Sequence, residues 1–75
     1  MPKLYQSREV LHALHKAGFV IVSQKGSHIK LRGIRDGKLH TVIVPNHKEI
    51  AFGTFTSILS QASMTKKEFE SYYYG

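Results

Sequence analysis

The sequence predicts an α+β fold in the order α-β-β-β-α, with two helices on one face of a three-stranded antiparallel sheet. Apolar residues recur at helical spacing near each end of the chain. Between them, β-branched and apolar runs are separated by turn residues, as in strands joined by hairpins. A chain of 75 residues makes one compact core, so we expect a single domain over residues 1–75.

The first helix is expected over residues 7–17. Ser7 is a residue type that caps helix starts, and Glu9 is favourable in the first turn. Gly18 follows the helix at the position where a left-handed residue ends it. The buried side of this helix is predicted to consist of Val10, Leu11, Leu14 and Ala17.

Three strands are expected over residues 19–24, 28–32 and 39–44, with turns at 25–27 and 35–38. The pair Asp36-Gly37 suits a two-residue hairpin loop, which makes Arg35 face Lys38. In that register the core face carries Ile29, Leu31, Val42 and Val44. The opposite, open face then carries His28, Lys30 and Arg32 beside Thr41 and Ile43.

The second helix is expected to be capped by Thr54 and to cover the sheet with Phe55, Ile58, Leu59 and Ala62. Residues 65–68 have capping-box spacing, which indicates a short final helix that packs Phe69 against the body. The tail, residues 72–75, is expected to fray.

The composition favours a polyanionic partner. Eleven Lys and Arg against five Asp and Glu give a net charge of +6 and a pI near 9.9. Such a balance attracts RNA, DNA or an acidic protein through charge and counterion release. The simpler alternative is that the positive charge only keeps a small protein soluble.

Several function classes are not supported by the sequence. Cysteine is absent, which excludes disulfides and thiolate metal sites. His12 and His15 lie three residues apart without further ligands at metal-binding spacing, so we expect no metal and no cofactor. No apolar stretch is long enough for a signal peptide or a membrane span, so a soluble, cytoplasmic protein is expected.

His28 is the best candidate for a catalytic residue, because imidazole exchanges protons near neutral pH without a metal. RNA carries its own nucleophile, the 2′-hydroxyl, so one such base is sufficient to begin cleavage. Phosphate would be bound and oriented by neighbours that we predict to be RNA-binding: Lys25, Gly26, Ser27, Lys30 and Arg32.

Each of these residues also has a purely structural interpretation. A histidine on the exposed face of a strand is usually only solvated. Gly26 could be a turn glycine and nothing more, and Lys30 and Arg32 could be the polar side of an amphipathic strand. His40, at the start of the third strand, could lie near His28 in space, where it would either orient RNA or only complete a hydrogen-bond network.

The order α-β-β-β-α is that of double-stranded RNA-binding domains, and the motifs resemble one family with this topology, the HicA toxins. The resemblance is carried by GFVIVSQKGSH at residues 18–28, VPNH at 44–47 and GTFTSIL at 53–59. These motifs occur in the order and spacing of the family, which is far more specific than the Gly-Ser-His triplet alone. Ser63 departs from the family pattern, where many relatives have glycine, and the hairpin over residues 33–38 is somewhat long.

This resemblance implies a type II toxin that cleaves messenger RNA independently of the ribosome and thereby arrests translation and growth. It implies a catalytic histidine at His28, a signature glycine at Gly26 and a supporting role for His47. It also implies a partner, a HicB-type antitoxin that covers the active site. The toxin would then contact DNA only indirectly, through this antitoxin.

Two other function classes remain possible from the sequence. The first is a non-catalytic module that binds double-stranded RNA by shape. Such modules carry phosphate-binding lysines at the start of the second helix, whereas residues 53–57 contain no cation. The second is a protein-binding domain whose basic face docks an acidic partner, which would cleave no RNA at any salt concentration.

Overall fold

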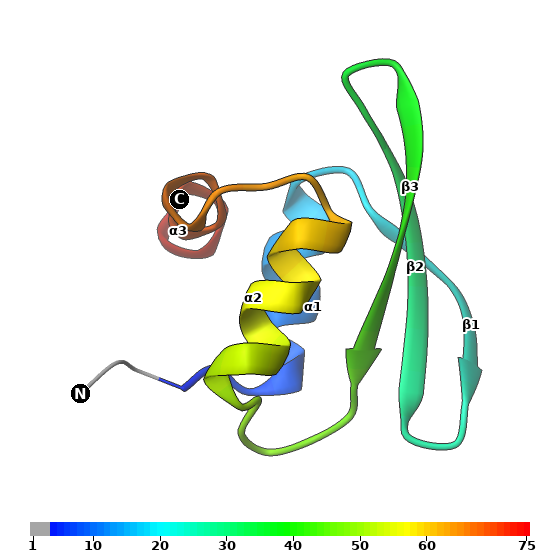
Figure 1. Cartoon of the computed structure of the whole chain (residues 1–75), viewed down its shortest axis with the longest axis vertical. Helices are drawn as coiled ribbons and strands as arrows, with labels where there is room; N and C mark the ends of the chain where they lie inside the picture. Colours follow the sequence, from blue (N-terminus) through cyan, green and yellow to red (C-terminus); the bar gives the residue numbers. More distant parts are fainter. Residues whose placement is uncertain (1–3) are drawn as a thin grey trace.

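The computed structural model describes residues 4–75 and has the predicted order of elements, with a third helix at the end. The first three residues of the expected 1–75 domain lie outside the described residues. Helices α1 and α2 lie on the same side of the sheet, and no helix of residues 4–75 covers its other side (Figure 1). None of the helices in residues 4–75 is both long and apolar enough to cross a membrane. The elements are α1 (Ser7–Lys16), β1 (Val20–Lys25), β2 (His28–Arg35), β3 (Lys38–Pro45), α2 (Phe52–Gln61) and α3 (Lys66–Tyr74).

The sheet is antiparallel in the order β1-β2-β3, and the predicted register of β2 and β3 is confirmed. Arg35 pairs with Lys38, because the loop between them adopts left-handed conformations at Asp36 (φ +53°) and Gly37 (φ +75°) that suit a tight hairpin. The side chains predicted for the core face are all buried: Ile29, Leu31, Val42 and Val44.

The two edges of the sheet differ. On the β3 edge, the side-chain oxygen of Gln61 in α2 accepts a hydrogen bond from the Ile43 N–H at 2.9 Å. On the β1 edge no residue is buried, and Val20, Ile21 and Val22 are each about half exposed. The reason is that α1 and α2 pack over β2 and β3 and leave the outer strand uncovered (Figure 1).

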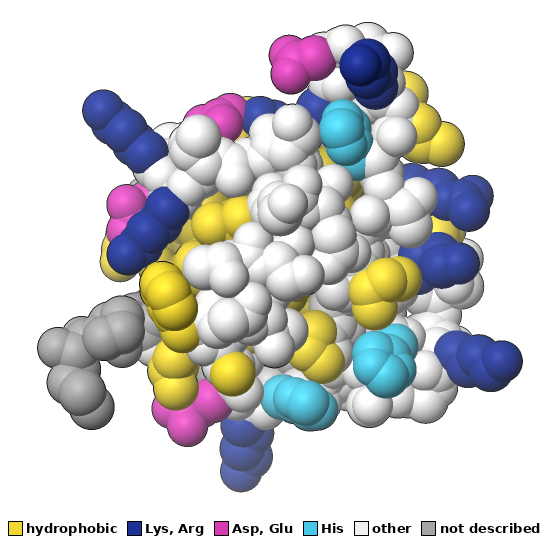
Figure 2. Space-filling view, viewed as in Figure 1, with side chains coloured by type: hydrophobic (Ala, Val, Ile, Leu, Met, Phe, Trp, Pro, Cys, Tyr) yellow, Lys and Arg dark blue, Asp and Glu magenta, His cyan; other side chains and the backbone are white. Residues whose placement is uncertain are grey.

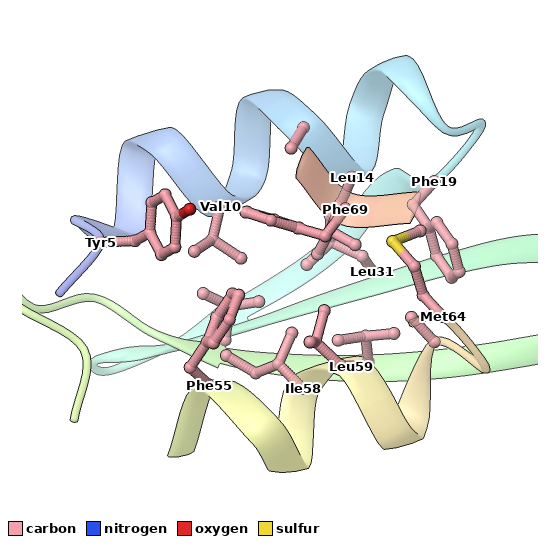
Figure 3. Packing of buried hydrophobic residues seen from close by; sticks show 14 of the residues in the cluster. Tyr5, Val10, Leu14, Phe19, Leu31, Phe55, Ile58, Leu59, Met64 and Phe69 are labelled. Atoms are coloured by element: carbon pink, nitrogen blue, oxygen red, sulfur yellow. The ribbon is translucent and has the colours of Figure 1, made fainter. Parts of the chain in front are cut away.

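The core lies between the two main helices and the sheet. Side chains from α1 and α2 meet over the strands, and Phe69 of α3 enters between them (Figure 3). The Phe69 ring is fully buried and lies about 5 Å, between ring centroids, from the rings of Tyr5 and Phe55. The expectation that residues 72–75 fray was wrong, because α3 continues to Tyr74 and Tyr73 packs its ring on Tyr5.

Both main helices begin differently from the predictions. The N-cap of α1 is Gln6, whose N–H donates to Glu9, and Ser7 is the first helical residue rather than the cap. Helix α2 begins at Phe52, so Thr54 lies inside it and does not cap it. Its start is fixed by tertiary contacts, since Ile50 is buried and its N–H donates to the Tyr5 carbonyl at 2.8 Å.

The C-terminal ends of α1 and α2 are each followed by a residue in the left-handed conformation, and the sequence predicts the first of them. Gly18 has the predicted left-handed conformation (φ +103°) after α1. Ser63 takes the corresponding position after α2 with φ +54°, and the next N–H, from Met64, bonds to the Leu59 carbonyl. Because this conformation favours glycine, Ser63 is strained where the resemblance leads one to expect glycine.

Candidate active site on the open sheet face

The turn between β1 and β2 places His28. Lys25 pairs with His28 across the strands, and Gly26 and Ser27 form the two-residue loop between them. Gly26 has φ +60°, the left-handed conformation that a tight turn of this kind requires at its first position. All four residues are exposed, so His28 stands at the start of β2 with its imidazole accessible to a ligand.

Side chains that are paired across strands point to the same face, so the predicted cations gather around His28. Lys25 lies directly opposite His28 on β1, and Lys30 and Arg32 follow on the same face at two-residue intervals along β2. The structure therefore brings Lys25 and Lys30 close to His28 and places Arg32 on the same face, four residues along β2 or about 13 Å away. Gly26 and Ser27 lie at the end of this face, in the turn itself.

The far end of the open face is apolar. Ile34 and Leu39 pair across β2 and β3 next to the hairpin tip, and their exposed fractions are 66% and 61%. The open face thus changes along its length from a cationic end at His28 to an apolar end at the hairpin. Both ends remain accessible because no helix packs on this side (Figure 1).

The cations of the open face are not neutralised. None of the five acidic residues of the chain lies on β1, β2 or β3, and the structure gives Lys25, Lys30 and Arg32 no acidic partner in residues 4–75. In Figure 2 the charged side chains on the sheet side, below the hairpin tip, are all Lys and Arg. Such a surface attracts a phosphate backbone.

Arg35 is different from the other cations of β2. It lies on the helix-covered face and forms an ion pair with Glu68 of α3. Burial lowers the pKa of Arg35, but the hydrogen bond and the charge of Glu68 outweigh it, and the net shift is upward. The hydrogen bond from the Thr65 N–H, followed by that from Arg35, lowers the pKa of Glu68. This pair holds α3 to the hairpin and leaves the candidate site unaffected.

Three of the other histidines, His12, His15 and His40, do not share the open face with His28. The suggestion that His40 lies near His28 was wrong, because His40 pairs with Gly33, five residues along β2, or about 16 Å. The strand alternation also puts His40 on the helix-covered face. His12 and His15 are exposed on α1, on the helix-covered side of the sheet (Figure 1).

His47 lies in the loop after β3, which is held against the turn of the candidate site. The Asn46 N–H donates to the Ser27 carbonyl at 2.6 Å, and Pro45 pairs with His28. Ser7 fixes the other side of this loop: its hydroxyl donates to the carbonyls of Pro45 and His47, and it accepts from the His47 N–H at 2.6 Å. Figure 2 shows histidine side chains over this end of the sheet.

Sequence reasoning missed the role of Ser7, which it interpreted as a helix cap. The partners of its hydroxyl lie 38 and 40 residues away, so no local pattern indicates them. Within residues 4–75 the structure has no cluster of three or more His, Cys, Asp or Glu side chains that could hold a metal ion.

The fold and the site define a small basic α+β domain with an accessible histidine on an uncovered, cationic sheet face. The model of a family described as the HicA toxin of bacterial toxin–antitoxin matches residues 7–64, which include α1, the whole sheet and α2. The chain belongs to this HicA toxin family, and it is thus related to the toxins of toxin–antitoxin systems. A comparison with curated proteins finds no match.

Proposed function

We propose that this protein is a metal-independent endoribonuclease, an mRNA interferase that acts as the toxin of a type II toxin–antitoxin pair with His28 as its catalytic residue. One observation carries the proposal: His28 is exposed at the cationic end of an open sheet face, in a chain of the HicA toxin family. RNA is the polyanion whose cleavage requires no more than a base and bound phosphate.

In the proposed mechanism, neutral His28 takes the proton from a ribose 2′-hydroxyl. The oxygen then attacks the adjacent phosphorus and displaces the 5′-oxygen of the next nucleotide, which takes a proton from water and leaves as a 5′-hydroxyl. A 2′,3′-cyclic phosphate remains on the other product, and His28 returns its proton to the solvent. Lys25 and Lys30 stabilise the negative charge that develops on the phosphoryl oxygens. Arg32, about 13 Å further along β2, binds a neighbouring phosphate of the strand. The N–H groups of the turn at Gly26 and the Ser27 hydroxyl are further donors to the phosphate.

The histidine alone accounts for only part of the acceleration of RNA cleavage. General acid–base catalysis is worth about 10²–10⁴-fold, so the cations must supply further acceleration by orienting the phosphate. The positions of these cations on rigid, paired strands suit that role, because strand residues lose little further freedom when RNA binds.

The chemical proposal is tested by incubating the purified protein with single-stranded RNA in the presence of a chelator and analysing the product ends. We expect cleavage that the chelator leaves unchanged, with 2′,3′-cyclic phosphate ends. Products that carry only 5′-phosphate and 3′-hydroxyl ends would show that water, rather than the 2′-hydroxyl, attacks. Intact RNA together with binding of double-stranded RNA would indicate a non-catalytic module.

The proposed partner is a HicB-type antitoxin that covers the open face and thereby His28. An inhibitor of this kind would place acidic groups over Lys25 and Arg32 and apolar groups over Ile34 and Leu39, both of which are exposed. Contact with DNA would then occur only through the antitoxin. We place the protein in the cytoplasm, where messenger RNA is translated.

A further inference from the structure

A second cationic surface lies beside the candidate active site. It is a hollow of about 260 Å³ between the start of α1 and the loop after β3. Three of the side chains that line it are basic, those of Arg8, His47 and Lys48, and none is acidic. The lining residues are Gln6, Ser7, Arg8, Asn46, His47 and Lys48.

This hollow adjoins the turn that carries His28. Asn46, which lines it, donates its N–H to the Ser27 carbonyl, and the preceding residue, Pro45, pairs with His28. If one phosphate of an RNA strand lies at His28, a neighbouring phosphate of the same strand can therefore lie at the hollow. The hollow and the candidate active site thus share the segment Pro45-Asn46 at the end of the sheet.

The hollow is built before any ligand binds. Ser7, buried under the loop, holds the backbone of Pro45 and His47 by its hydroxyl, and its own N–H donates to the His47 carbonyl at 3.1 Å. Because the backbone of the loop is already fixed, the entropic cost of ordering it when a ligand binds is small.

The cations of the hollow are available to a ligand. The Nε of Arg8 donates to Gln6, and the structure gives its two terminal nitrogens no partner in residues 4–75. The nearest acid on α1, Glu9, is turned elsewhere, since its carboxylate accepts from the Gln6 N–H and the Tyr73 hydroxyl. Lys48 and its neighbour Glu49 are exposed, and only Lys48 lines the hollow.

We propose that this hollow is a second phosphate subsite, which binds an RNA phosphate on one side of the scissile bond through Arg8 and Lys48. Asn46 and His47 supply additional hydrogen-bond donors to the same phosphate. The subsite rests on the proposed endoribonuclease function and extends it, because it fixes the direction of the strand across His28. A planar guanidinium and a lysine ammonium are the two side chains best suited to phosphate oxygens.

The test compares the affinity of wild-type protein and the double variant Arg8→Gln/Lys48→Gln for a single-stranded oligoribonucleotide with 2′-O-methyl groups throughout. This probe has phosphates and bases but no nucleophile, so binding is measured without cleavage. The matched control is Lys66→Gln/Lys67→Gln, which removes the same charge from exposed positions on α3. Circular dichroism checks that all three proteins fold.

We expect the Arg8/Lys48 variant to bind roughly ten-fold more weakly than the α3 control. The magnitude of the slope of log affinity against log salt should fall by about 0.7, since the hollow binds one phosphate and each phosphate contact to a single strand contributes about 0.7. Arg8→Lys/Lys48→Arg, which keeps both charges, should restore most of the binding. With cleavable RNA, the double variant should raise KM more than it lowers kcat.

The failures of the two proposals can be told apart. If the wild type binds the probe and the Arg8/Lys48 variant is indistinguishable from the α3 control, the subsite is refuted and the proposed catalytic role of His28 is untouched. If the wild type neither binds the probe nor cleaves RNA, the proposed function is refuted and the subsite with it.

Discussion

At the scale of single residues, Ser7 shows how one buried side chain can position a candidate site. It is 3% exposed and is the one buried polar side chain among residues 4–75. Buried hydroxyls need partners, and Ser7 finds them in a loop that follows β3 rather than in its own helix. The loop with Asn46 and His47 is therefore fastened to α1 on one side and to the turn before His28 on the other.

Replacing Ser7 with alanine should destabilise the protein by about 1–3 kcal/mol, because it leaves part-buried backbone groups of Pro45 and His47 without their partner. For a domain of this size, whose total stability is of the order of 4–11 kcal/mol, that is a substantial loss. Urea denaturation followed by circular dichroism measures it. Ser60→Ala, at an exposed position of α2, is the control and should change stability by less than about 0.5 kcal/mol. Equal stability of the two variants would contradict the role of Ser7.

The candidate site itself could be predicted largely from residue types. The turn glycine and the strand alternation after it place His28, Lys30 and Arg32 on one face, and the structure confirms this arrangement. Arg8 and Lys48 could not be predicted, because their proximity depends on the hydrogen bonds of Ser7 to residues about 40 positions away. Local patterns contain no information about such contacts.

At the scale of elements, turns were more predictable than helix starts. The pair Asp36-Gly37 determined the register of β2 and β3, since the loop length fixes which residues face each other. The starts of α1 and α2 were not determined by the best capping residues, Ser7 and Thr54, because tertiary hydrogen bonds fix the chain before each helix.

Helix α3 lies beyond the part of the chain that matches the family model, yet it completes the core. Its Phe69 packs between rings of the body, and its Glu68 pairs with Arg35 of β2. The capping box of Thr65 and Glu68 is confirmed, and the same carboxylate that begins the helix also anchors it to the sheet.

The ion pair between Glu68 and Arg35 predicts a dependence of stability on pH. The pKa of Glu68 is lowered from its ordinary value of 4.5, first by the Thr65 N–H and then by Arg35. A carboxyl group whose pKa is lower in the folded state adds stability above its ordinary pKa, and the contribution disappears as pH falls through the folded value. The difference in Tm between wild type and Glu68→Gln should therefore be largest at neutral pH and shrink below pH 4.5.

Thermal melts from neutral pH into the acid range measure this difference. Glu70→Gln on the same helix is the matched control, because it removes an equal charge from a side chain for which the structure gives no contact with Arg35. A difference for Glu68→Gln that stayed constant down to the most acidic pH would contradict the assignment.

At the scale of the whole molecule, charge is unevenly distributed: the strands carry cations only, whereas the helices and loops carry charges of both signs. The strands carry cations and no acidic residue, whereas the five acidic residues lie in the helices, the loops and the hairpin tip. The sheet side therefore presents a positive surface of Lys and Arg (Figure 2). This arrangement orients a polyanion toward the open face before specific contacts form.

The catalytic role of His28 is the central claim, and its most direct test is the single-turnover rate of RNA cleavage by wild type, His28→Ala and His12→Ala. His12 is an exposed histidine on α1, on the helix-covered side of the sheet, and serves as the matched control. We predict that His28→Ala remains folded by circular dichroism and cleaves about 10²–10⁴-fold more slowly, while His12→Ala keeps the wild-type rate. A folded His28→Ala protein that cleaves RNA as fast as the wild type would contradict the claim.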